Sequence, residues 1–344
     1  MVRTALITGV SGQDGAYLSK FLLGRGYRVL GQVQRGAPPR TARLTELGIR
    51  RDIEIVEMDL FDLVEMRREL ERIRPDELYN LAGPSSVAHS FDQPIIPLEV
   101  NAVAAARLLE AARLAIPNVR FFQPSTAEMF GTARSSPQNE STPFRPRSPY
   151  AVAKLFSHWQ TVSYREAYKF YGACGILFNH ESPLRSRQFV TRKITAELAQ
   201  VKYGRRDRVS LGDLEVRRDW GFAGDYVEGM WRALQQPEPE DYVFATGIST
   251  SVRTFVELAT RCLGISLEWS GSELAEIGID RKTGRTVIDI SPTLFRPAEV
   301  RETVGDAQHA RDKLGWTPLV DLPAIVAMMA MADERRLLEN RSLD

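Results

Sequence analysis

Short apolar runs alternate with segments of helical period through the first half of the chain. In the helical segments apolar residues share one face, as Leu18 and Leu22 do near the start and Leu108 and Ala112 do later. The runs between them predict strands at Thr4–Thr8, Arg28–Gln34, Ile53–Met58, Glu77–Leu81, Arg120–Pro124 and Ala173–Phe178. Such alternation requires crossover helices, so the pattern predicts an α/β fold with a doubly wound parallel sheet.

The pattern becomes less regular after about Asn179. The turn at Gln235–Asp241 and the polar stretch Ser270–Arg285 interrupt it, which predicts a smaller, mainly C-terminal lobe. We therefore expect residues 1–178 to form one domain and residues 179–344 to form mainly the lobe, with residues from about 216 to 250 returning to the first domain. A ligand should bind between them, at the carboxyl ends of the strands.

The composition excludes several classes of function. Lys and Arg total 45 against 44 Asp and Glu, so no global charge invites nucleic acid or an anionic membrane. Two cysteines and four scattered histidines offer neither a disulfide framework nor a metal-ligand spacing, so we expect no metal. The start lacks the pattern of a signal peptide, and the apolar stretch near the C-terminus predicts a buried helix rather than a membrane span. The expected location is a reducing cytoplasm.

Three glycines open the first predicted helix. Gly9, Gly12 and Gly15 follow the first strand in the stretch T-G-V-S-G-Q-D-G. Glycines let backbone amides approach a pyrophosphate, and the start of a helix adds a partial positive charge. A tight strand-to-helix turn can also need glycine for steric reasons alone. Because the turn lies within an alternating α/β pattern, we interpret it as the dinucleotide site of a Rossmann-type domain.

An arginine follows the second predicted strand where NAD-binding proteins usually carry a carboxylate. Arg35 stands in V-Q-R-G, and no acid follows before Glu46. A guanidinium suits a ribose 2′-phosphate, which favours NADP over NAD. A solvated surface arginine is the alternative. Arg40 and Arg43 either add to the same pocket or face water.

The stretch S-P-Y-A-V-A-K places Tyr150 and Lys154 four residues apart, on one face of a predicted helix. A nearby ammonium should lower the pKa of the phenol and make it a usable base. Ordinary packing of the tyrosine beside an extended lysine is the alternative. The end of the fifth strand adds Thr126 and Glu128, which should open onto the same cleft unless they only cap the turn and face solvent.

These motifs together resemble the nucleotide-sugar branch of the extended short-chain dehydrogenase/reductases. More narrowly, they look like the GDP-mannose 4,6-dehydratases, through I-T-G-V-S-G-Q-D-G-A-Y-L, S-P-Y-A-V-A-K, L-F-N-H-E-S-P-L-R, F-V-T-R-K, R-R-D-W-G-F-A-G-D-Y-V and F-R-P-A-E-V. The resemblance runs from Ala5 to about Trp316.

The resemblance implies a role for each matching residue. The catalytic residues would be Thr126, Glu128, Tyr150 and Lys154. Those that line the NADP cofactor would be Gly9, Gly12, Gln13, Asp14, Arg35, Asp59, Leu60, Leu81, Ser85, Tyr150, Lys154, His180 and Arg185. Those that hold the GDP-sugar would be Ser85, Asn179, Val190, Lys193, Arg218, Arg296 and Glu299. It further implies a homodimer or a homotetramer.

The family chemistry would oxidise the sugar at C4, eliminate water across C5 and C6, and return the hydride to C6. Tyr150 would take the O4 proton and Glu128 the C5 proton. The sequence departs from the family pattern at Ala127, where relatives have serine or, in the dTDP-glucose dehydratases, aspartate, and Glu128 must then act as both base and acid. Pro84 replaces a usual glutamine, and Ser186 and Arg187 replace a usual Gly-Glu.

Other functions stay open at this point. A related dehydratase of a GDP-hexose or GDP-heptose, a 4-keto reductase and a 4-epimerase would share most of these residues. An epimerase has no use for a base at C5, so Glu128 argues against it. A non-catalytic dinucleotide-binding protein could be built on the same fold.

Overall fold

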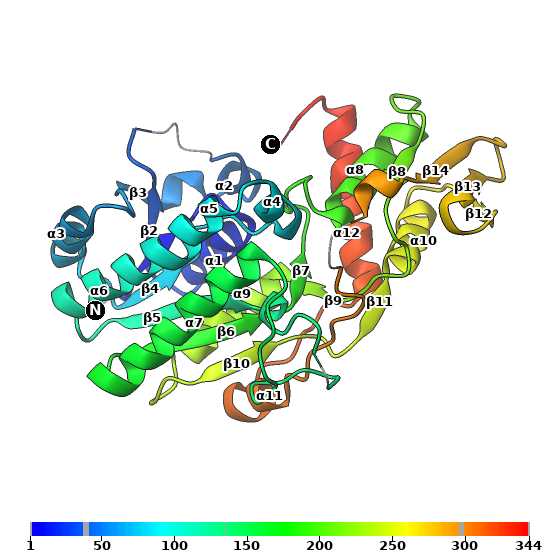
Figure 1. Cartoon of the computed structure of the whole chain (residues 1–344). Coiled ribbons are helices and arrows are strands. Elements are labelled where there is room, and N and C mark those ends of the chain that lie inside the picture. The colour runs from blue at the N-terminus through cyan, green and yellow to red at the C-terminus, as the bar shows by residue number, and fades with distance from the viewer. Residues whose placement is uncertain (1, 37–40, 134, 296–298, 343–344) are drawn as a thin grey trace.

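A seven-stranded sheet forms the centre of the computed structural model, which describes residues 2–36, 41–133, 135–295 and 299–342. Its order is β10-β6-β5-β4-β1-β2-β3, and every neighbouring pair is parallel (Figure 1). The strands are β1 (Thr4–Thr8), β2 (Arg28–Val33), β3 (Glu54–Glu57), β4 (Glu77–Asn80), β5 (Arg120–Thr126), β6 (Gly172–Leu177) and β10 (Asp241–Phe244). The predicted doubly wound α/β fold is confirmed.

Each of the six predicted strands is present with its bounds shifted by at most two residues. Alternate residues of β1 face opposite layers, as a strand buried on both faces requires. Ala5 and Ile7 pack in the core beside α1 (Gln13–Leu23) and α9 (Ala223–Ala233), and Leu6 packs in the core beside α3 (Leu63–Ile73) and α6 (Ala105–Ala115).

Further helical segments complete these two layers. They are α2 (Ala42–Glu46), η1 (Arg50–Asp52), α4 (Val87–Asp92), α5 (Ile95–Pro97), the π-helix η2 (Leu98–Ala104), η3 (Ala127–Met129), α7 (Pro149–Tyr168) and α11 (Gln308–Leu314).

A separate core lies beside the large sheet. Its strands form a three-stranded sheet of β7 (Asn179–Glu181), β9 (Arg217–Phe222) and β11 (Ser249–Ser251), and a four-stranded sheet of β8 (Val209–Leu211), β12 (Leu267–Ser270), β13 (Ile277–Asp280) and β14 (Thr286–Ile290). Its helices are α8 (Val190–Lys202), α10 (Val252–Cys262), η4 (Glu273–Ala275), η5 (Pro292–Leu294) and α12 (Leu322–Leu338), of which α8, α10 and α12 are grouped together in Figure 1.

Residues from about 216 to 250 are shared between the two parts. α9 packs against the large sheet and β10 is its edge strand, whereas β9 and β11 belong to the three-stranded sheet. The point at which one domain ends and the other begins stays a prediction.

The C-terminal helix α12 has the buried apolar residues that its sequence predicts, among them Ile325, Val326 and Met329. None of the helices in the described ranges combines the length and the apolar character that crossing a bilayer requires.

Glu46, at the end of α2, links the two parts of the chain. Its carboxylate accepts hydrogen bonds from Arg335 and Arg336 of α12, at 2.9 and 3.1 Å, and from Arg341 just beyond that helix, at 3.1 Å. The C-terminal helix is thereby held against the helix that follows β2.

Candidate active site

A cavity of about 590 Å³ opens where the strands of the large sheet end. Residues that follow β1, β4, β5 and β6 line one side of it, and residues of α8, β9 and the segment after β14 line the other. The cavity brings together most residues of the predicted site, namely Gly9, Gly12, Gln13, Asp14, Leu81, Ser85, Thr126, Glu128, Tyr150, Lys154, Asn179, His180, Arg185, Val190, Lys193, Arg218 and Glu299.

The start of α7 explains the stretch S-P-Y-A-V-A-K. The Ser148 hydroxyl caps the helix by accepting a hydrogen bond from the Ala151 amide at 3.1 Å, and Pro149 occupies the first turn, where its missing N–H costs nothing. Tyr150 and Lys154 then lie one turn apart and both line the cavity.

The phenol of Tyr150 does not have the lowered pKa that the sequence suggested. Burial raises its pKa to about 12, and the charge of Glu128 adds to this, while a hydrogen bond with the Thr126 hydroxyl and the charge of Arg185 oppose it. Lys154 is not among the groups that lower it, so the expected effect of the ammonium is wrong for this structure. Burial also lowers the pKa of Lys154, to about 8.

Thr126 and Glu128 occupy the end of β5 as predicted. The Thr126 hydroxyl accepts a hydrogen bond from the Glu128 amide at 3.3 Å and begins the short helix η3. Ala127, between them, is buried, whereas Glu128 is half-buried at the cavity wall. Thr126, Glu128 and Tyr150 all line the cavity, and the Thr126 hydroxyl is a hydrogen-bond partner of the Tyr150 phenol.

The glycine turn suits a dinucleotide. Gly9 has a φ of +66°, and a Cβ there would lie 2.6 Å from the carbonyl oxygen of Leu81. Gly12 is the N-cap of α1 and has no side chain to bond the first amides of the helix. Those amides remain for a phosphate.

Asp14 and His180 connect the glycine turn to β7. His180 Nε2 lies 3.0 Å from Asp14 Oδ2, and Nδ1 lies 2.7 Å from the carbonyl oxygen of Phe178. Both ring nitrogens face acceptors, so both donate and the ring is cationic. Burial alone would lower the pKa of His180, but the Asp14 carboxylate outweighs burial and raises it. Burial alone would raise the pKa of Asp14, but chiefly the charge of His180 lowers it to about 2.

Two basic residues, Lys193 and Arg218, line the side of the cavity formed by α8 and β9, and both donate hydrogen bonds to oxygen atoms of the protein. Lys193 Nζ donates to the carbonyl oxygen of Ser210 at 2.6 Å. Arg218 donates to Glu299 at 2.7 Å and to the carbonyl oxygen of Val300 at 2.7 Å. The predicted ligand Arg296 lies outside the described residues.

Three predicted cofactor residues do not line the cavity. Arg35 follows β2 and donates a hydrogen bond to Glu65 on α3, while Asp59 and Leu60 follow β3. Since β2 lies beside β1 and β3 lies beside β2, these residues continue the line of strand ends away from the glycine turn. Their roles stay predictions.

Arg40 and Arg43 were predicted either to join Arg35 in one pocket or to face water. Arg40 lies outside the described residues. Arg43 donates hydrogen bonds to the carbonyl oxygens of Leu184, at 2.7 Å, and Ser11, at 3.5 Å.

Several residues that line the cavity have no role among the predictions made from the sequence. Asn101 is buried in the π-helix η2, where its amide donates to the carbonyl oxygen of Pro84 at 2.9 Å. A π-helix breaks the 3.6-residue period, so no periodic signal marks Asn101. The other missed residues include Asp92, Gln188, Phe189, Leu211, Gly212, Asp213, Val216, Trp220, Val252, Thr293, Leu294 and Phe295. Of these, Phe189, Trp220 and Phe295 stand inside a quoted motif with no role assigned. Directly beside a quoted motif stand Gln188, Val216 and Leu294.

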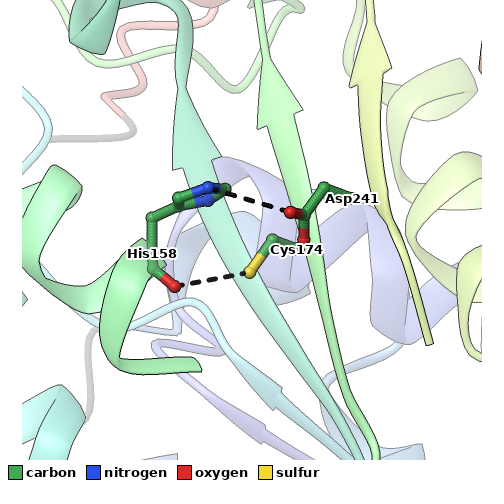
Figure 2. Close-up of side chains that lie close together, drawn as sticks. All are labelled: His158, Cys174 and Asp241. Carbon is green, nitrogen blue, oxygen red and sulfur yellow. Dashed lines mark hydrogen bonds and ion pairs between the residues drawn. The ribbon is translucent and has the colours of Figure 1, made fainter. Parts of the chain in front are cut away.

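A polar cluster lies behind the cavity wall, although the sequence spacing gave no sign of it. Figure 2 shows His158 of α7, Cys174 of β6 and Asp241 of β10 pointing toward one another. The atoms with which these side chains could bind a metal ion all lie within 4.8 Å of one another. His158 Nδ1 lies 2.9 Å from the Ser125 hydroxyl, and Asp241 accepts from Arg165 at 2.9 Å. Burial lowers the pKa of His158. The cluster therefore supports Ser125 from behind.

Comparisons with known proteins agree with the geometry of the cavity. The family model described as GDP-mannose 4,6 dehydratase matches residues 6–329. The chain belongs to the GDP-mannose 4,6-dehydratase family. It is 47% identical to the GDP-mannose 4,6-dehydratase of Sinorhizobium fredii (strain HH103), over 91% of this chain and 92% of that protein. It is 44% identical to the GDP-mannose 4,6 dehydratase of Drosophila melanogaster, over 98% of this chain and 88% of that protein.

Solved structures share the fold of this family member at low sequence identity. The dTDP-glucose 4,6-dehydratase of Bacillus anthracis in complex with NAD has a TM-score of 0.79 at 16% identity, covering 97% of each chain. RMD from Pseudomonas aeruginosa complexed with NADPH has a TM-score of 0.76 at 22% identity, covering 97% of this chain and 100% of that chain. Both similarities concern the fold.

Proposed function

We propose that this family member is an NADP-dependent dehydratase that converts GDP-D-mannose into GDP-4-keto-6-deoxy-D-mannose and water. The proposal rests on one observation. Tyr150 and Glu128 line the same cavity, near enough for the carboxylate to raise the pKa of the phenol. A dehydratase needs a base at O4 and a second at C5, whereas an epimerase or a 4-keto reductase does not need the second.

Tyr150 removes the proton from the sugar O4. At a pKa of about 12 the phenol is almost wholly protonated near neutral pH, so it must first lose its own proton to solvent before it can act as the base. The hydrogen bond with Thr126 and the positive charge of Arg185 favour that loss. Thr126 bonds the phenol and orients it toward O4. Lys154, with a pKa of about 8, carries its charge at neutral pH and holds the neighbouring ribose.

Glu128 carries the elimination. Once C4 is a ketone, the C5 proton is acidic, and the carboxylate takes it while the C6 hydroxyl leaves. Because the neighbouring residue is Ala127, Glu128 also gives the proton that makes this hydroxyl a molecule of water.

The residues at the glycine turn fit a nicotinamide dinucleotide. A nicotinamide dinucleotide held there would supply hydride transfer, from C4 and later to C6, without net consumption. The proton that C5 regains in the last step balances the one that Tyr150 takes from O4. Gly9 and Gly12 admit the pyrophosphate, and the cationic His180 faces the same turn. Arg218 and Lys193 hold the diphosphate of the substrate, with Glu299 orienting Arg218.

The test of function is an incubation of the purified protein with GDP-mannose and no added cofactor, followed by mass spectrometry. We expect a product lighter by one water, formed by NADP that co-purifies with the protein. A reaction that strictly requires added NADPH and consumes it would support a reductase instead. A panel of GDP-hexoses and GDP-heptoses in the same assay would identify the sugar.

Selection of NADP is assigned to Arg35. Its guanidinium has donors beyond the one that bonds Glu65 and can reach a ribose 2′-phosphate. Arg35→Gln should weaken NADPH binding roughly tenfold and NADH binding little, since the lost bond is charge-assisted. Fluorescence titration measures both affinities. Arg28→Gln, which breaks an exposed ion pair between β2 and Glu54 of β3, is the control. An equal loss for both cofactors would contradict the assignment.

We also propose a homodimer formed through α7. Val152, Phe156 and Trp159 are each about half exposed on this helix, and Ile95 and Leu98 are exposed on the adjoining α5 and η2. A contiguous apolar face of this kind is typical of a subunit interface. Light scattering should report a dimer, and Phe156→Ser with Trp159→Ser should give a monomer. A monomeric parent protein would refute the proposal.

A further inference from the structure

A chain of buried side-chain hydrogen bonds crosses three neighbouring strands beneath the cavity. Thr8, Asn80 and Gln123 stand at or near the carboxyl ends of β1, β4 and β5, and all three are buried. The Thr8 hydroxyl lies 3.1 Å from Asn80 Oδ1, and Asn80 Nδ2 lies 2.9 Å from Gln123 Oε1. These bonds join strands that lie side by side in the sheet.

The chain continues to the cavity at both ends. On one side the amide of Ala82, a cavity residue in the loop after β4, donates to the Thr8 hydroxyl at 3.1 Å. On the other, Gln123 Nε2 lies 3.2 Å from the hydroxyl of Ser157, which lies 3.0 Å from the carbonyl oxygen of Lys154. The chain therefore runs from the loop after β4 to the helix turn that carries Lys154.

The backbone groups at the two ends fix the direction of every bond. The Lys154 carbonyl can only accept, so Ser157 donates to it and must accept from the amide of Gln123. Gln123 then presents its oxygen to Asn80, which in turn presents its own oxygen to Thr8. The Thr8 hydroxyl donates to that oxygen and accepts from the Ala82 amide, which can only donate. All the donors point one way, and such bonds polarise and strengthen one another.

We propose that Gln123 and Ser157 are positioning residues that fix Lys154 relative to the glycine turn and the loop after β4. Thr8 directly precedes Gly9, and a Cβ on Gly9 would meet the backbone of Leu81 and Ala82, so turn and loop are already packed together. The hydrogen-bond chain adds the helix α7 to this unit. The role rests on the proposed function, because it concerns the residues that hold the ribose and the phenol.

The cost of leaving buried polar groups unpaired favours a hydrogen-bond chain whose members act as one unit. Removing Gln123 takes from Asn80 Nδ2 the acceptor that it bonds at 2.9 Å, and removing Ser157 leaves Gln123 Nε2 with only the adjacent Pro124 carbonyl, at 3.2 Å. Either change breaks the connection between β5 and the helix turn of Lys154. Displacement of a reacting group by a fraction of an ångström lowers the rate of the chemical step far more than it lowers substrate affinity. Loss of any one hydrogen bond in the chain should therefore slow the same chemical step.

The variants are Gln123→Met, Ser157→Ala and the double variant, with Thr161→Val as the matched control. Thr161 lies on the same helix, is as buried as Ser157, and donates a hydrogen bond to the Ser157 carbonyl at 2.9 Å without joining the chain. Thermal melts establish that all four proteins are folded. Steady-state kinetics with GDP-mannose and fluorescence titration with NADPH are then measured.

We expect each single variant to lower kcat about tenfold with KM changed less than about twofold, because Lys154 and Tyr150 are misplaced rather than removed. NADPH should bind roughly threefold to tenfold more weakly, through the loss of ribose contacts with Lys154. The double variant should fall no further than the worse single variant, and Thr161→Val should match the parent protein.

Two results would overturn the proposal. One is that Gln123→Met and Ser157→Ala behave like Thr161→Val in kcat and NADPH affinity. The other is that the two losses add in the double variant. A parent protein that binds NADPH but does not dehydrate GDP-mannose would refute the proposed function instead, and NADPH binding by the variants would still decide the positioning role.

Discussion

The two ends of the cavity are built in different ways. At the reacting end, Tyr150, Lys154 and Thr126 stand on α7 and β5, and the buried layers beneath the sheet fix their places. At the nucleotide end, Lys193 and Arg218 stand on the smaller part of the chain, bonded to a backbone carbonyl and to Glu299. Under the proposed function, the first end would change the energy of a proton, and the second would exchange a protein partner for a ligand phosphate. Substitutions at the first end should therefore alter kcat, and substitutions at the second should alter KM.

The largest effect should come from Tyr150→Phe. Loss of the phenol oxygen removes the base at O4, and kcat should fall about a thousandfold with little change in KM or in the melting temperature. Product formation measured by mass spectrometry checks this. A variant that dehydrates at the parent rate would show that another group is the base.

Glu128→Gln should separate the two steps proposed for the reacting end, which are oxidation at C4 and elimination of water. The neutral amide cannot take the C5 proton, so turnover should fall about a hundredfold or more while oxidation at C4 continues. In a single turnover, NADPH fluorescence should rise and persist in the variant, whereas in the parent protein it should decay. If no NADPH accumulates, Glu128 acts before the elimination or does not act at all.

Arg218→Met tests the nucleotide end. The side chain keeps its apolar length but loses its charge-assisted bonds to a phosphate, so KM for GDP-mannose should rise roughly thirtyfold with kcat nearly unchanged. Arg217→Met, at an exposed arginine of the same strand, is the control and should change KM little. A fall in kcat as large as the rise in KM would remove the distinction between the two ends.

The smallest effect should come from the ion pair between His180 of β7 and Asp14 of α1, which joins the two parts of the chain. The pKa of His180 is raised, so the pair stabilises the fold fully below the ordinary imidazole pKa of about 6.5 and loses this contribution as the pH rises through the folded-state value. The pKa of Asp14 is lowered to about 2, so its contribution is lost only as the pH falls toward that value.

His180→Asn should therefore lower the free energy of unfolding by about 1 kcal/mol at about pH 6 and by less at about pH 9. Urea unfolding at the two pH values measures the difference. His309→Asn, at a more exposed histidine beside Glu240, should change the free energy little at either pH. Equal losses at the two pH values would mean that the ring acts by packing against Tyr226 and not by its charge.

Six of the seven strands of the large sheet could be predicted from the sequence, because they are short runs with apolar residues in an alternating strand and helix pattern. The seventh, β10, was not predicted, because it directly follows the turn at Gln235–Asp241, where the pattern becomes irregular. The same rule located Tyr150, Thr126 and Glu128, since they follow strand ends or helix starts. The pairing of Gln13 with Ser182, 169 residues apart, has no local signal, and neither has the cluster around His158. The pKa of Tyr150 was predicted in the wrong direction, because burial depends on the packed cavity and not on a neighbour four residues away.

The three arginines gathered on Glu46 have a practical consequence for anyone who prepares this protein. Arg341 is nearly the last residue described, yet it bonds the helix that follows Arg35 and its neighbours. A purification tag is therefore better fused at the other end of the chain, and a C-terminal fusion should be designed so that Arg341 keeps its contact.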